Sequence, residues 1–272
     1  VNGQAGTEVP LGTRATPSNN FPDTMLIAQK ESIRTIRLLD STTLDINAVV
    51  TDMRITSDSA VTTLCTIDSA AQVSGCSFED LTVQGTLDGM NEFERCSINN
   101  INYVNGFIFQ CAINGTITLG GGAQCSILDC WSNVAGGGVG QYATVDMGGS
   151  GNSLALRNYA GGVLIENYSG GGAVSIDMSS GRVVVDSTVT AGEVYIRGVA
   201  EVEDNSTGTA QVFDMTVNEG LDVMTADVNE IHQIHGLEQG SPLVVSNTSR
   251  TAGGISQTIA EDGNGTTTIT RQ

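Results

Sequence analysis

Six cysteines are the residues of this chain whose type and spacing could most readily do chemistry. Five of them begin the same short phrase, in which a small residue and then Ile or Phe follow the cysteine: Cys65, Cys76, Cys96, Cys111 and Cys125. A zinc site needs paired ligands, such as a C-x2-C matched by a second pair. No C-x2-C occurs, and the single H-x-x-H, at His232 and His235, lies far beyond Cys130. The spacing therefore argues against a structural zinc site.

The cysteine phrase fits a structural role. Residues i and i+2 of a strand share a face, so the cysteine and the Ile or Phe would both point into a core. Free cysteine behaves as a small buried hydrophobe, and stacked parallel strands place equivalent residues about 4.8 Å apart. We therefore predict that these five cysteines form one inward-facing ladder, with no catalytic, cofactor-binding or metal-binding residue among them. The same spacing would allow an occasional disulfide, whereas a reactive thiol needs a basic neighbour, and only Arg95 is close in sequence.

Carboxylates are the second candidate for chemistry, because two of them about 5–9 Å apart can cleave a glycosidic bond. The candidates on strand-like segments are Glu79, Asp80, Glu94, Asp129, Asp146, Glu166, Asp177 and Asp186. One Trp and five Tyr supply few aromatic platforms for sugars, so solvated surface acids are the expected interpretation. Residues 148–156 (GGSGNSLAL) resemble a calcium-binding nonapeptide, but Ser153 replaces the ligand aspartate and a turn is expected. Neither G-x-S-x-G nor G-K-[ST] occurs.

The composition predicts a β protein. Gly numbers 34, aromatic residues make up 4% and charged residues 15% of the 272 residues, which favours many short strands and tight turns. The formal charge of −19 argues against nucleic acid as a partner, and no apolar run is long enough to insert in a membrane. The chain begins at Val1 without a signal peptide, so we expect it to be a trimmed or processed part of a longer protein.

Strand-length segments recur at short intervals, most clearly LALRNY, VLIENY, AVSIDM, RVVVDS and EVYIRG between residues 154 and 198. Such repetition predicts a β-solenoid, a right-handed parallel β-helix or a close relative, with a β-sandwich as the alternative. The expected organisation is an extended lead-in and capping helix (1–33, with the helix at 22–33), the solenoid (34–217), a linker with a short helix (218–236, helix at 225–236) and a small β element (237–272). Within the last part, Leu243–Val245 and Ile255–Ile259 are β-like.

Three stretches of the chain resemble virion proteins of tailed bacteriophages. They are VNGQAGTEVPLGTRATPSNNFPDTMLIAQKESIRTIRL at the start, the block from DMGGSGNSLALRNYAGG to VEDNSTG, and HGLEQGSPLVVSNTSRTAGGISQTIAEDGNGTTTITRQ at the end. These virion proteins are structural tail, neck or fibre components without catalytic motifs, so the resemblance assigns no residue a functional role. It implies an oligomeric β-helical component of the virion, with three chains the expected number, assembled in the host cytoplasm.

The expected function is therefore that of a structural tail or fibre protein with a part in assembly or host attachment. Its expected partners are further copies of itself, other virion proteins, and a host-surface glycan or receptor. Two other classes stay open: a tailspike-like glycan depolymerase, which would need paired acids in a groove, and a cell-surface adhesin, which would need a secretion route. Few sugar platforms and no secretion signal favour the first class over the other two.

Overall fold

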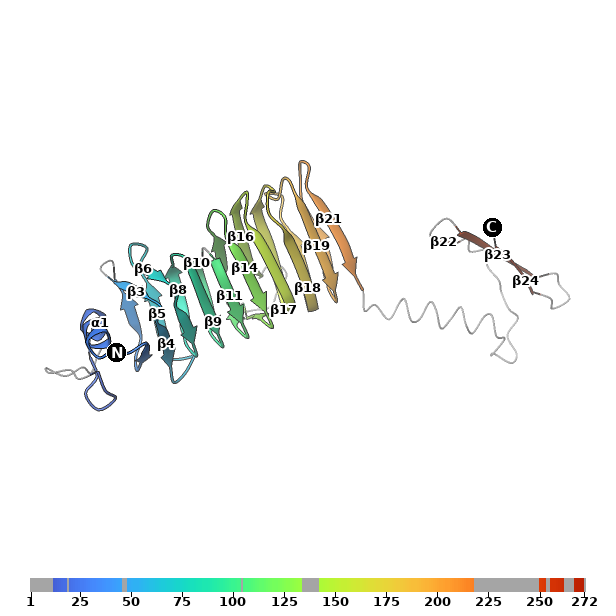
Figure 1. Ribbon diagram of the computed structural model, residues 1–272. Helices are drawn as coiled ribbons and strands as arrows, with labels where there is room; N and C mark the ends of the chain where they lie inside the picture. Colours follow the sequence, from blue (N-terminus) through green and yellow to red (C-terminus); the bar gives the residue numbers. More distant parts are fainter. Residues whose placement is uncertain are drawn as a thin grey trace, which may run out of the picture. The chain divides into compact units, whose positions relative to one another are not determined.

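The computed structural model describes residues 12–18, 20–45, 48–103, 105–133 and 142–217, together with three strands nearer the C-terminus. The chain divides into two compact units, Val1–Asn218 and Glu219–Gln272. The first unit contains a parallel β-solenoid of about 9 turns, which confirms the predicted fold class (Figure 1).

Helix α1 (Phe21–Lys30) precedes the first coil and packs against its strands (Figure 1). Asn20 caps it by accepting a hydrogen bond from the Asp23 N–H, and Pro22 occupies the first turn, where its missing N–H costs nothing. Phe21 and Ala28 are buried on the side that meets the solenoid. The predicted helix is confirmed, although it ends at Lys30, three positions before the predicted boundary at Ile33.

The strands of the solenoid form three sheet faces, which we name A, B and C in the order in which the chain visits them. Face A consists of β1 (Thr35–Leu38), β4 (Arg54–Ser57), β7 (Ser77–Glu79), β9 (Met90–Glu94), β11 (Asn105–Phe109), β14 (Gln124–Leu128), the first parts of β17 (Ser153–Tyr168) and β18 (Val174–Val185), β19 (Glu193–Gly198) and β21 (Gln211–Thr216).

Faces B and C are built in the same parallel way. Face B consists of β2 (Thr42–Leu44), β5 (Leu64–Ile67), β8 (Thr82–Thr86), the start of β10 (Ser97–Tyr103), β12 (Ala112–Ile113), β15 (Trp131–Ser132) and the middle of β17 and β18. Face C consists of the ends of β8 and β10, then β13 (Thr116–Leu119), β16 (Ala143–Gly149), the ends of β17 and β18, and β20 (Glu201–Asp204). β3 (Val49–Thr51) and β6 (Gln72–Ser74) pair with each other in a separate two-stranded sheet.

Parallel pairing in register stacks like residues into columns through the core. The longest column on face A consists of Ile36, Ile55, Phe78, Phe93, Ile108, Ile127, Leu156, Ile176 and Ile196, all of them buried. The Phe78 and Phe93 rings stack with centroids 5.3 Å apart. Because each side chain contacts its equivalent in the next coil, similar shapes fill the interior without gaps.

The corner between faces A and B is unusually tight. The residue that leaves face A adopts a left-handed conformation in successive coils, at Asp80, Arg95, Gln110, Asp129 and Asn158. The N–H of such a residue donates to a carbonyl of the following coil, as from Gln110 to Leu128 at 3.1 Å. The hydrogen-bonded ladder therefore continues around the bend, and only one buried residue separates the left-handed residue from the first strand of face B.

The later corner between faces B and C depends on glycine. Gly161 of β17 pairs with Gly181 of β18, and Gly181 has a φ of +114°. A Cβ atom on Gly181 would lie 2.1 Å from the Gly161 carbonyl oxygen, so no side chain fits there. This is why β17 and β18 run through the bend as single long strands.

The C-terminal unit contains a three-stranded antiparallel sheet of β22 (Arg250–Ala252), β23 (Ile255–Glu261) and β24 (Thr267–Arg271). The predicted β stretch Ile255–Ile259 falls within β23. The predicted stretch 243–245 and the predicted helix 225–236, with its two histidines, lie outside the described residues.

Candidate functional site

All six cysteines are buried and none forms a disulfide. In each of the five predicted phrases the Ile or Phe two residues later is also buried, as the alternation requires. The prediction of a single ladder, however, is wrong. Cys65 pairs with Thr42 and Val83 on face B, and Cys125 pairs with Gly106 and Leu154 on face A.

The correction follows from unequal coil lengths. Cys76, like Cys125, begins a face A segment, and its N–H donates to the Oδ1 of Asn91 in the next coil at 3.1 Å. Cys76, Asn91, Gly106 and Cys125 therefore share one column, with two coils between the cysteines. The phrase marks strand beginnings on two faces, and sequence similarity alone could not assign a phrase to a face.

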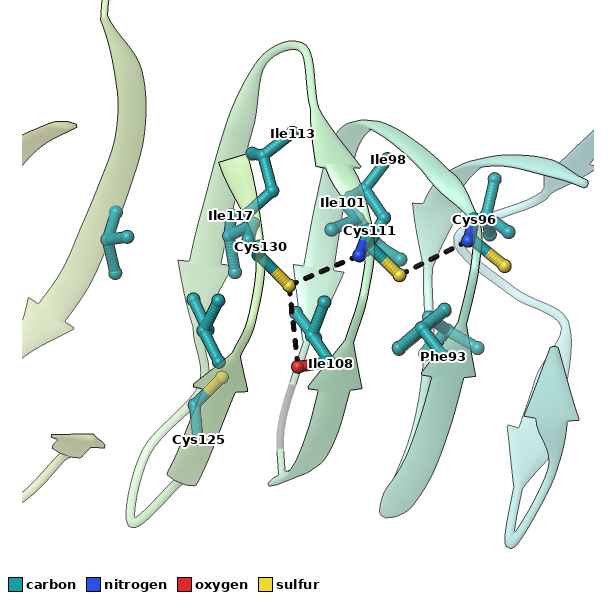
Figure 2. Packing of buried hydrophobic residues seen from close by; sticks show 14 of the residues in the cluster. Phe93, Cys96, Ile98, Ile101, Ile108, Cys111, Ile113, Ile117, Cys125 and Cys130 are labelled. Atoms are coloured by element: carbon teal, nitrogen blue, oxygen red, sulfur yellow. Dashed lines mark hydrogen bonds between the residues drawn. The ribbon is translucent and has the colours of Figure 1, made fainter. Parts of the chain in front are cut away.

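The true ladder consists of Cys96, Cys111 and Cys130 (the cysteine column), each directly after a left-handed residue at the corner between faces A and B. The Cys96 N–H donates to the Cys111 Sγ at 3.2 Å, and the Cys111 N–H donates to the Cys130 Sγ at 3.3 Å. Figure 2 shows the three sulfur atoms in successive coils, with Cys125 on a separate strand. Sequence comparison missed Cys130 because Trp131 and Ser132 follow it, although D-C at 129–130 matches R-C and Q-C at the earlier corners.

The thiols of the solenoid are suited to packing rather than to nucleophilic chemistry. Burial raises the pKa of Cys65 to about 12, and burial also raises the pKa of Cys125. Hydrogen bonds to Cys130 and Cys96, together with burial, raise the pKa of Cys111. Arg95, the one basic residue near these cysteines in sequence, directs its guanidinium to Asp80 and Glu94 instead. The thiols of Cys65, Cys111 and Cys125 therefore stay protonated at neutral pH, which is the unreactive form, whereas the hydrogen bond with Cys111 lowers the pKa of Cys130.

We predict that Cys111→Ala lowers the free energy of unfolding by about 1–3 kcal/mol, because the buried Cys96 N–H loses its acceptor. The matched control is Cys125→Ala, in which no hydrogen bond to sulfur is lost and about 1 kcal/mol is expected. Urea unfolding followed by circular dichroism measures both. Equal losses in the two variants would contradict the acceptor role of the Cys111 sulfur.

Three of the acids that sequence put forward lie together in an ion cluster on face A. Glu79 is buried and accepts hydrogen bonds from the Nε and Nη2 groups of Arg54. Arg95 lies 3.7 Å from the same carboxylate, binds Asp80 at 2.9 Å, and also contacts Glu94. The hydrogen bond from Arg54 is the main cause that lowers the pKa of Glu79. Glu79 is therefore held ionised and is not suited to act as a proton donor.

Because the folded-state pKa of Glu79 lies below its unfolded value of about 4.3, its contribution to stability is present above that pH and is lost on acidification. We expect Glu79→Gln to unfold at lower urea concentration than the native chain at pH 7. At about pH 3 the difference should be smaller, since Glu79 is then largely protonated in the unfolded chain and its contribution is being lost. A difference of unchanged size at both pH values would show that the ion pair is not its cause.

A second set of acids forms a column on face C. Asp146, Glu166 and Asp186 occupy equivalent positions in three successive coils. Asp146 accepts from the Gly148 N–H and the Asn167 amide, and Asp186 accepts from the Thr188 N–H, so both carboxylates also fix turns. Burial and then the charges of Asp146 and Asp186 raise the pKa of Glu166. Sequence named all three acids but could not show that they are neighbours.

For Glu166 the effect of pH on stability has the opposite sign to that for Glu79. Its folded-state pKa is raised, so the repulsion is absent below about pH 4 and costs stability as the pH rises through the folded value. We expect Glu166→Gln to gain about 0.5 kcal/mol at pH 7, and to lose this gain below about pH 4. Glu201→Gln serves as control because Glu201 lies 3.8 Å from Arg182, and it should not gain. Equal gains in the two variants would contradict the repulsion, and urea unfolding across this pH range gives the comparison.

Of the remaining candidates, Asp177 lies within β18 with Arg197 as its register partner, and the others belong to turns and corners. Within 148–156, Asn152 is fully buried, accepts from the Ala123 N–H at 2.8 Å and donates to the Met147 carbonyl. This stretch is therefore a turn held by an asparagine. Asp129 accepts from the Asn158 amide at 2.7 Å. Among the described residues, no group of three or more His, Cys, Asp or Glu side chains is arranged to hold a metal ion.

A search of protein-family models, of curated proteins and of solved structures found no match for this chain. In the part of the chain that the structure describes, no helix is long and apolar enough to span a membrane.

Proposed function

We propose that this chain is a structural component of a tailed-bacteriophage virion, of the tail or fibre type, that contributes to assembly and host attachment. The observation that carries the proposal is the parallel stack of strands from β1 to β21, with a helix packed on its first coil. Nearly every backbone group of such a stack is bonded to the coil before or after it, which resists unfolding and exposes few strand edges. The resemblance of the sequence to virion proteins supports the same role.

The proposal includes association of three chains along face A. From Phe107 onward, the outward column on this face contains Ser126, Ala155 and Ser175 and then Tyr195 and Phe213, while before Phe107 it contains Glu92. Phe107 is 46% exposed, and the Tyr195 and Phe213 rings stack at 4.8 Å on the surface. Small residues between exposed aromatic rings make a surface against which another rod can lie closely.

Native mass spectrometry of the full chain at micromolar concentration should give three times the chain mass of 28.2 kDa. Ala155→Arg, which places a charge in the middle of the face A column, should shift the mass to that of the monomer. Ser180→Arg is the matched control, because Ser180 is exposed in a face B column. A native chain that stays monomeric, or equal disruption by both arginines, would contradict the arrangement. Electron microscopy of phage particles carrying a labelled chain would test the virion role directly.

A glycan-cleaving function is the second candidate, and the acid column on face C is the observation that favours it. Adjacent coils separate equivalent residues by about 4.8 Å, close to the carboxylate spacing of retaining glycosidases, and Glu166 has the raised pKa that a general acid needs. Release of reducing sugar from host-surface polysaccharide by the native chain, and its loss in Glu166→Gln, would establish this alternative over a purely structural role.

A further inference from the structure

A groove of about 700 Å³ crosses the corner between faces A and B, over several successive coils. Its floor is formed by the tight corners, which contribute the left-handed residues Arg95, Gln110 and Asp129. One wall comes from the loop that joins β4 to β5, through Ala60 and Val61. The groove is thus built by one long loop beside a row of short corners.

The wall is fixed in place by the next coil. The Thr82 Oγ1 donates to the Ala60 carbonyl at 2.5 Å. Val61 is 91% exposed at the top of this wall. In later coils only two residues join the corresponding strands, as at Arg95–Cys96 between β9 and β10, so the wall stands above them.

Trp131, the only tryptophan of the chain, lines this groove. It belongs to an outward column on face B in which its neighbours on either side are Ala112 and Ala160, with Ser97 one coil further. Small neighbours leave the indole 43% exposed instead of covering it. An exposed indole beside a groove offers an apolar face to a ligand and keeps its N–H available as a donor.

Two amide side chains in the groove make no hydrogen bond with any described residue, those of Gln110 and Asn133. Asn133 follows a ladder of side-chain hydrogen bonds on face B, in which Gln84 donates to Thr66, Asn99 to Gln84 and Asn114 to Asn99. The ladder stops there, and the buried Oδ1 of Asn114 has no partner within the described residues. An amide both donates and accepts, which matches the hydroxyl groups of a sugar.

The charged groups of the groove are already engaged. Arg95 binds Asp80 and Glu94, and Asp129 accepts from Asn158. The net charge of −19 also opposes the approach of an acidic polymer. The polar groups left for a ligand are therefore neutral, and an uncharged ligand suits them.

We propose that this groove binds a segment of a neutral polysaccharide, with one sugar ring packed on Trp131 and its hydroxyl groups bonded to Gln110 and Asn133. We expect the sugar to be bound here without being hydrolysed, because the floor of the groove carries no free pair of carboxylates. For its biological setting the inference rests on the proposed attachment function. The two can fail separately, because sugar binding is measured on the chain alone and the virion role on particles.

The sole tryptophan makes the test direct. The full chain is titrated with neutral malto-, cello- and galacto-oligosaccharides and with an oligogalacturonate, and Trp131 fluorescence is recorded. We expect a saturable change with at least one neutral oligomer and none with the uronate. No saturable change with any neutral oligomer at millimolar concentration, or tighter binding of the uronate, would overturn the proposal.

Variants locate the binding site. Trp131→Leu and the pair Gln110→Ala with Asn133→Ala should each weaken binding at least tenfold by calorimetry, while circular dichroism shows an unchanged fold. Leu26→Ala removes another exposed apolar side chain, on α1, and should bind like the native chain. Unaltered binding in Trp131→Leu, or an equal loss in Leu26→Ala, would place the sugar elsewhere and overturn the inference.

Discussion

Parallel pairing in register is the constraint on which the rest of this structure depends. Each residue of a coil has its equivalent in the next coil as its nearest neighbour, about 4.8 Å away. For apolar and amide side chains this arrangement is favourable: Phe78 stacks on Phe93, and Asn114 donates to Asn99. For charges it is costly, since Asp146, Glu166 and Asp186 repel one another. Glu79 also has an acid, Glu94, as its register partner, but there the repulsion is offset because Arg54 binds Glu79 and Arg95 contacts Glu94.

Cysteine suits the corner between faces A and B for two physical reasons. At these three corners a small side chain fills the buried position, and the N–H that follows the left-handed residue needs an acceptor. A thiol satisfies both needs, because its volume is small and its sulfur accepts the N–H of the preceding coil. The same position holds Tyr159 one coil later, where the core is filled by a large ring. The role of these thiols is therefore to fill the core and to accept backbone hydrogen bonds.

The shape of the solenoid surface depends on whether successive coils are alike or differ in length. A regular coil presents flat columns, such as the small residues of face A, and flat columns suit contact between rods. The longer loop between β4 and β5 breaks this regularity and makes the groove beside Trp131. Both proposals for partners, another copy of the chain and a neutral glycan, thus depend on features that the repeat itself creates or interrupts.

Local alternation, the recurrence of short strands and the helix start at Pro22 and Asp23 were enough to predict the solenoid and its first helix, because these patterns act within a few residues. The burial of the five cysteines that begin the recurring phrase followed from the same alternation. Which residues lie side by side did not, because coil length varies from the 15 residues between Cys96 and Cys111 to the 29 between Ala123 and Asn152. Only the tertiary structure decided that Cys130 joins Cys96 and Cys111 while Cys65 and Cys125 do not. It also decided that Glu166 lies between two acids and that Trp131 stands at a groove, since each of these depends on the register between coils.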